Sequence, residues 1–168
     1  MTLLDEIEAA IPALRRYAVA LVGDRDRADD LVQDCLERAL SRRHLWRGDG
    51  PVRAWMFRIL LNLARDRFRR AARMHVVGAD DLAAPTFAGG QEAHLELGAV
   101  QAAMARLPDD QRAALLLVAL EGLSLADAAR ALGVPQGTLV SRLGRARAAL
   151  RAMTGRETIA PKRKDMPG

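Results

Sequence analysis

Apolar residues recur three or four positions apart along most of this chain, and glycine or proline interrupts the pattern at short intervals. Near the amino terminus the apolar positions are Ile7, Ile11, Leu14, Ala18 and Leu21, and the pattern stops at Gly23. No segment alternates with the two-residue period of a β-strand. Aromatic residues make up only 4% of the chain, which leaves leucine and alanine to build the core. These features predict an all-α fold.

The chain divides into two helical halves. Its 168 residues suffice for one ordinary domain or two small ones, which excludes a large enzyme with separate cofactor and substrate domains. Residues 74–97 contain Pro85, a Gly89-Gly90 pair and four acidic residues but no lysine or arginine, as is typical of a flexible linker. We therefore expect small helical domains at 1–73 and 98–153, and a mobile basic tail at 154–168.

Capping signals and breakers define the expected helices. They run from a capping box at Thr2 and Asp5 to Gly23, from about Asp24 to Arg43, over 51–73, 98–106 and 108–120, from a capping box at Ser124 and Asp127 to Gly133, and from 134–138 to about Met153.

Basic charge is concentrated in two segments. All 26 basic residues except Lys162 and Lys164 are arginines, and the formal net charge is +5. Residues 53–73 hold seven arginines and one acidic residue, and residues 134–155 hold four arginines and no acidic residue. This distribution predicts a polyanionic partner.

The sequence gives no indication of a metal, a cofactor or a membrane span. Cys35 is the single cysteine, so an internal disulfide is excluded, and we expect it to be a small core residue. The three histidines lie far apart in the sequence and form no zinc motif. The amino terminus is acidic rather than basic, and no apolar run approaches the length of a membrane helix. We expect no cofactor and no bound metal, and a soluble, cytoplasmic protein.

Residues 125–144 fit a helix-turn-helix. Ala129 is small where the two helices would cross, and Gly133 stands at the turn. The last helix has an apolar side and an outer side without acidic residues, which suits the major groove of DNA. Its outer residues are Thr138, Ser141, Arg142 and Arg145. The alternative is a basic, solvated helix in an α-hairpin.

A polar stripe follows the helix at 51–73. It consists of Arg58, Asn62, Arg65 and Arg69, which recur at helical spacing. The arginines would bind phosphates, and an asparagine amide among them can also read a base edge. A solvated surface is the alternative. We expect the nearby aromatic side chains to be core residues rather than stacking platforms for bases; they are Trp55, Phe57 and Phe68.

An acidic and amide surface is expected on the second helix. Asp30, Gln33, Asp34 and Glu37 share one helical side, which could meet a basic partner, hold a divalent cation or simply be solvated. An enzyme using Asp26, Asp29, Asp30 and Asp34 as a metal site for phosphoester hydrolysis is a further alternative. These carboxylates have no histidine or nucleophile beside them, so we assign no catalytic residue.

Three segments together resemble the extracytoplasmic-function sigma factors of bacterial RNA polymerase. They are RADDLVQDCLERAL, WRGDGPVRAWMFRILLNLARDRFRR and LPDDQRAALLLVALEGLSLADAARALGVPQGTLVSRLGRARAAL. The likeness covers about residues 5–152, and the first helix with its DDLVQD context is similar to the general-stress subgroup of alphaproteobacteria.

The resemblance implies a role in transcription initiation for both domains, neither of them an enzyme. The first, a sigma region 2 domain, would bind core polymerase and the minus-ten element, and the second, a region 4 domain, the minus-thirty-five element. Asp30, Gln33 and Asp34 would dock on the clamp helices of the largest polymerase subunit, with Glu37 beside them. Asn62 would lie near the base extracted from the minus-ten strand, with Arg58, Arg65 and Arg69 around it. The minus-thirty-five residues would be Gln136, Thr138, Ser141, Arg142 and Arg145.

One further expectation follows from the family. Its members are commonly held inactive by an anti-sigma factor, so such a partner is expected here. The main rival hypothesis is a stand-alone helix-turn-helix regulator, which would bind an operator as a dimer and without polymerase.

Overall fold

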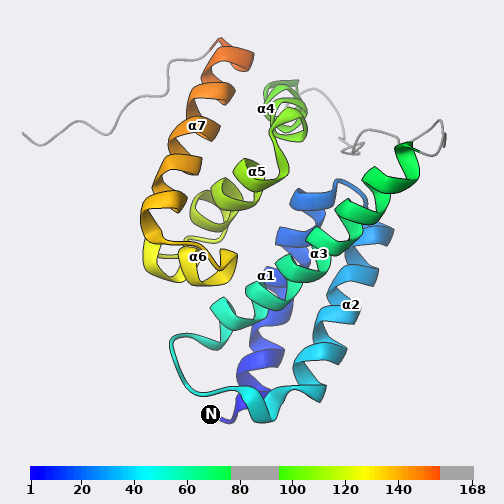
Figure 1. Ribbon diagram of the computed structural model, residues 1–168, viewed down its shortest axis with the longest axis vertical. Helices are drawn as coiled ribbons and strands as arrows, with labels where there is room; N and C mark the ends of the chain where they lie inside the picture. The colour runs from blue at the N-terminus through cyan, green and yellow to red at the C-terminus, as the bar shows by residue number, and fades with distance from the viewer. Residues whose placement is uncertain (77–94, 156–168) are drawn as a thin grey trace, which may run out of the picture.

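A computed structural model describes residues 1–76 and 95–155, and every regular element in these ranges is helical. The elements form two units, one from the first three α-helices and one from the last four, which lie side by side (Figure 1). The predicted all-α class with a helix-turn-helix in the second unit is confirmed.

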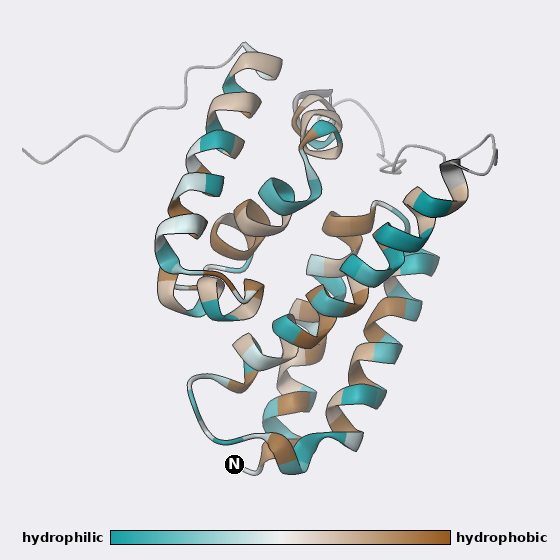
Figure 2. Ribbon diagram, viewed as in Figure 1, coloured by the Kyte–Doolittle hydropathy of each residue, from teal (hydrophilic) through white to brown (hydrophobic). Residues whose placement is uncertain are grey.

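The first unit packs α1 (Leu3–Val22), α2 (Arg25–Ser41) and α3 (Val52–Val76) around one core, with a short 3₁₀ turn, η1 (Arg43–Leu45), after α2. The capping box predicted at the start of α1 is present: the Thr2 hydroxyl accepts from the Asp5 N–H at 3.2 Å, and the Asp5 carboxylate accepts from the Thr2 N–H at 2.9 Å. Hydrophobic residues recur along all three helices (Figure 2), and the buried ones form one core.

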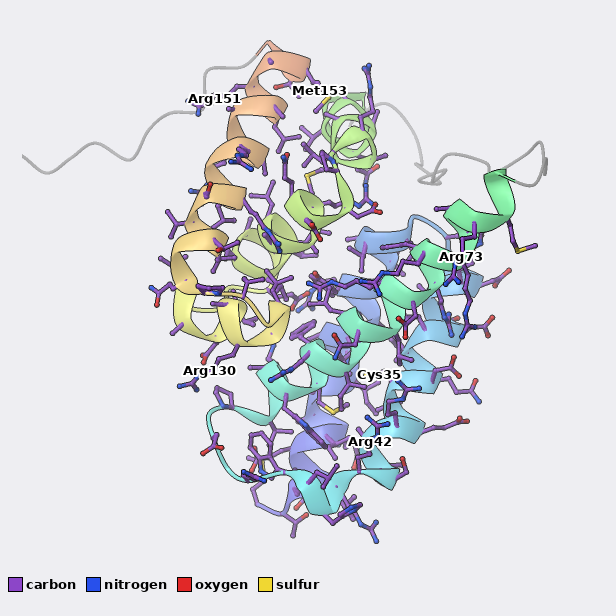
Figure 3. The ribbon with its side chains drawn as sticks, viewed as in Figure 1. Cys35, Arg42, Arg73, Arg130, Arg151 and Met153 are labelled. Carbon is purple, nitrogen blue, oxygen red and sulfur yellow. The ribbon has the colours of Figure 1, made fainter. Side chains whose placement is uncertain are left out.

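Cys35 is a core residue, as predicted. It is fully buried, inside the three-helix unit (Figure 3), and its Sγ lies 3.5 Å from the Met56 carbonyl. Burial raises the pKa of the Cys35 thiol to about 12, so it stays protonated. Leu40, near the end of the same helix, is 43% exposed. One residue turns an α-helix by about 100°, so Leu40 lies well round the helix from the buried Ala39.

The second unit contains α4 (Leu95–Arg106), α5 (Asp109–Leu115), a π-helical turn η3 (Leu116–Leu120), α6 (Leu125–Leu132) and α7 (Gln136–Thr154). The helix expected at 108–120 therefore ends in a wider turn, in which the Glu121 N–H bonds to the Leu116 carbonyl five residues earlier. Arg112 is buried and donates to the carbonyls of Met104, Ala105 and Leu107. This arginine closes the end of α4 and is unavailable to a nucleic acid.

Helices α6 and α7 form the predicted helix-turn-helix. The Ser124 hydroxyl accepts from the Asp127 N–H at 3.1 Å, and Gly133 ends α6 with a φ of 66°, a conformation that favours glycine. Ala129 is buried at the crossing. The inward side of α7 is also as predicted, since Leu139 and Leu143 are buried.

The two units share one continuous core. Helix α6 packs against α3, and η3 packs against α1. Helix α3 passes the expected boundary at Arg73 and ends at Val76, and α4 begins inside the expected linker. The rest of that linker, 77–94, and the tail from 156 lie outside the described residues.

Candidate nucleic-acid interface

The polar stripe of α3 lies mostly on an open surface. Arg58, Asn62 and Arg69 are exposed, whereas Arg65 is half-buried. The Arg65 guanidinium donates to the Leu132 carbonyl of α6 at 3.0 Å. Three of the four predicted minus-ten residues are therefore accessible, and the fourth is engaged in the contact between the units.

Two tryptophans flank one end of this stripe. The rings of Trp46 and Trp55 lie 5.4 Å apart, and with Arg58 and Arg130 they line a cavity of about 480 Å³. Of the three aromatic residues expected in the core, Phe57 is fully buried. Trp55 and Phe68 are half-buried and pack against the core. The sequence alone did not single out Trp46, because it stands outside the periodic segments.

The outer face of α7 is only partly open. Gln136, Ser141 and Arg145 are exposed, and Thr138 is half-buried. The side chain of Arg142 is 21% exposed and lies 3.8 Å from the Asp110 carboxylate. Arg142 also lines a cavity of about 480 Å³ with Arg65 and Arg69 of α3. The structure thus brings arginines from both predicted DNA surfaces to one place between the units.

The acidic and amide side of α2 is exposed as a set; it consists of Asp30, Gln33, Asp34 and Glu37. The Asp34 carboxylate forms an ion pair with Arg67 of α3. Among the residues that the structure describes, no group of three or more acidic, histidine or cysteine side chains is arranged to hold a metal ion. The exposed carboxylate and amide oxygens of this surface are hydrogen-bond acceptors.

Glu121 is the residue that sequence reasoning missed. Its side chain is completely buried between the units and is paired with Arg16 of α1 and Arg53 of α3. The only signal in the sequence is an acidic residue that ends the apolar run of η3, and its arginine partners stand far away in the chain.

Within the described part of the chain, no helix combines the length and the apolar character that crossing a membrane requires.

Known protein families match both units. Residues 7–61 match the sigma2 domain of PhyR, and residues 97–150 match sigma-70 region 4. The ECF RNA polymerase sigma factor EcfG of Rhodopseudomonas palustris is 44% identical over 165 residues, which cover 95% of this chain and 91% of that protein. The ECF RNA polymerase sigma factor SigM of Mycobacterium tuberculosis is 38% identical, over 84% of this chain and 71% of that protein.

Solved structures agree with this assignment. The sigma factor RpoE of Bartonella quintana, solved with the anti-sigma factor NepR, is similar with a TM-score of 0.79 and 32% identity, over 92% of this chain and 97% of that one. CnrH, solved with the cytosolic domain of CnrY, is similar with a TM-score of 0.67 and 28% identity, over 93% of this chain and 89% of that one. The sequence motifs, the two helical units and these likenesses together show that the chain belongs to the extracytoplasmic-function sigma factors of RNA polymerase, and to their general-stress type.

Proposed function

We propose that this sigma factor divides promoter recognition between α3 and α7 and binds core polymerase through α2. The observation that carries the proposal is the pair of basic helical faces in a chain 44% identical to an ECF sigma factor. In this scheme residues 1–73 act as the region 2 domain, 74–97 as the linker and 98–153 as the region 4 domain. The exposed α2 residues would meet basic groups of the polymerase; they are Asp30, Gln33, Asp34 and Glu37.

The α7 face is assigned to the minus-thirty-five element. Exposed Gln136, Ser141 and Arg145 can enter the major groove, where arginine pairs with guanine through two hydrogen bonds. Half-buried Thr138 stands at the edge of this face, and Arg142 would complete it once its contact with Asp110 is released.

Arg145→Ala is expected to weaken binding of the holoenzyme to the upstream element by about 1–3 kcal/mol, because a bidentate base contact is lost. Fluorescence anisotropy with labelled promoter DNA at fixed salt measures this. Arg147→Ala is the matched control: it removes the same charge from an exposed position on the opposite side of α7. If both variants lose the same affinity for the upstream element, Arg145 contributes only its charge and does not contact a specific base.

The α3 stripe is assigned to the minus-ten element. Opening the duplex requires unstacking, which costs a few kcal/mol, and a base held beside Asn62 offsets that cost. Arg58, Arg65 and Arg69 would bind the neighbouring phosphates.

Asn62→Ala is expected to slow promoter opening by roughly tenfold while leaving initial binding nearly unchanged, because the amide acts only on the extracted base. Permanganate footprinting reports opening, and a band shift in the cold reports initial binding. The side chain is exposed and alanine is a better helix former, so the fold tolerates the change. Equal loss in both assays contradicts this role.

We also propose an anti-sigma partner, a cytoplasmic location and the absence of any catalytic activity of the chain itself. RpoE, which has a similar fold, was solved with the anti-sigma factor NepR, and CnrH was solved with the cytosolic domain of CnrY. A chain that acts together with RNA polymerase on promoter DNA is expected to do so in the cytoplasm. The polymerase itself catalyses RNA synthesis, so this chain needs only to bind the polymerase and DNA.

A band shift with and without core polymerase tests the proposal against the stand-alone regulator. We expect specific promoter binding only when core polymerase is present. Tight binding of a promoter by the isolated chain, unchanged by core, would favour the stand-alone regulator instead.

A further inference from the structure

Val140 is an exposed apolar side chain in the second helix of the helix-turn-helix. It is 50% exposed. It stands one helical turn after Gln136 and directly before Ser141, which are both exposed and belong to the face proposed to bind the upstream element. The surrounding residues, 134–155, include four arginines and no acidic residue. Val140 is therefore an apolar member of a polar and basic surface.

The helical neighbours of Val140 leave its isopropyl group uncovered. On an α-helix, the residues three and four positions away lie next to a given side chain. For Val140, two of these positions hold glycine, namely Gly137 and Gly144. A Cβ atom on either glycine would meet no other atom within 4 Å, so packing among the described residues does not require glycine there. Glycine is unfavourable in a helix interior. A helix that lacks these two side chains can, however, approach a partner surface closely.

The isopropyl group of Val140 is also held in one orientation. A β-branched side chain in a helix strongly prefers a single χ1 rotamer, so it loses little conformational entropy when a partner packs against it. Valine has no hydrogen-bonding group in its side chain. Val140 can therefore contribute to recognition only through apolar contact.

The major groove of DNA presents one apolar group that suits such a side chain. The base edges there carry hydrogen-bond donors and acceptors, and thymine adds a C5-methyl group. In helix-turn-helix proteins, the residues near the start of the second helix contact these edges. Val140 is the fifth residue of α7, which begins at Gln136. The basic surroundings of Val140 favour DNA over an apolar protein surface as its partner.

We propose that Val140 is a specificity-determining residue that contacts the C5-methyl group of one thymine in the upstream promoter element. This inference rests on the proposed function, which places the outer face of α7 in the major groove. Gly137 and Gly144 let the helix lie close enough for the short isopropyl group to reach the thymine methyl group. Removing one methyl group from water should favour thymine by about fourfold over the same base without that group.

Replacing thymine by uracil in the DNA tests this contact, because uracil lacks only the C5-methyl group and keeps every hydrogen-bonding group of the base. The probes are promoter fragments on which the chain and core polymerase initiate transcription, each with one thymine of the upstream element replaced. We expect the holoenzyme to bind one of these fragments about fourfold more weakly than the unmodified fragment. Fluorescence anisotropy at fixed salt measures the affinities.

Val140→Ala provides the second half of the comparison. Holoenzyme with this variant should bind the unmodified fragment about fourfold more weakly and should no longer distinguish it from the uracil fragment. The side chain is exposed and alanine is the better helix former, so the fold tolerates the change. Met153→Ala is the matched control. Met153 is 36% exposed near the other end of α7 (Figure 3), so this variant should keep the full preference for thymine.

The proposal is overturned if no uracil replacement weakens binding, or if Val140→Ala keeps the full preference for thymine. Weaker binding of Val140→Ala to core polymerase, with an unchanged preference for thymine, would assign the side chain to a protein contact instead. A holoenzyme that does not distinguish the upstream element from a scrambled sequence contradicts the proposed function of α7, and the role of Val140 with it. A holoenzyme that distinguishes these sequences but responds to no uracil replacement contradicts the role of Val140 alone.

Discussion

Replacing Phe57 with alanine is expected to lower the free energy of unfolding by about 3–5 kcal/mol, the cost of removing a buried phenyl ring and leaving a cavity. The ring has no exposed surface and meets the edge of Tyr17, with centroids 5.0 Å apart and an interplanar angle of 69°. The Arg53 guanidinium lies 5.6 Å from its centroid, so the same ring supports an arginine that is paired with Glu121.

Urea unfolding followed by circular dichroism measures this effect. Leu40→Ala is the control, because Leu40 is 43% exposed and its loss should cost about 0.5 kcal/mol or less. If Phe57→Ala lowers the free energy of unfolding by less than about 1 kcal/mol, the packing described for the first unit is contradicted.

Asp30→Arg is expected to weaken binding to core polymerase by at least roughly a hundredfold, because placing like charges against each other at an interface costs several kcal/mol. Asp30 is exposed on α2, so the reversal leaves the core of the chain intact. It is preferable to Asp34, which is already paired with Arg67.

Biolayer interferometry with immobilised core polymerase measures the affinity. Glu8→Arg reverses an exposed charge on α1 and should leave it unchanged. Reversing a charge that contributes to an interface should weaken binding by far more than about threefold. If Asp30→Arg changes the affinity for core polymerase by less than about threefold, α2 does not contact the polymerase as proposed.

Local signals in the sequence account for most of the helices. Capping side chains at Thr2 and Ser124 and the left-handed glycine at Gly133 act within a few residues of where they stand, so their effect can be read from the sequence. The apolar side of α7 was likewise predictable, because its buried leucines repeat at helical spacing. Leu40 lies at the flank of the apolar face of α2, where the neighbouring helices decide exposure.

The packing of the two units could not be predicted in this way. Glu121 and Arg16 are 105 residues apart, and the Tyr17 hydroxyl and Ala113 carbonyl are 96 apart. Neither pair carries a periodic or capping signal, since each partner alone resembles an ordinary helical residue. The partial burial of Arg65 follows from the same packing, and Arg142 is partly covered by its contact with Asp110 of α5.

Run-off transcription with purified core polymerase tests the central claim most directly. The templates are upstream regions of the genes whose transcripts rise when this chain is overproduced, together with unrelated upstream regions as controls. We predict a discrete transcript from the first set that requires both core polymerase and the chain. If core with the chain yields no more promoter-dependent product than core alone on every template, the chain does not direct initiation and the assignments of α2, α3 and α7 are wrong.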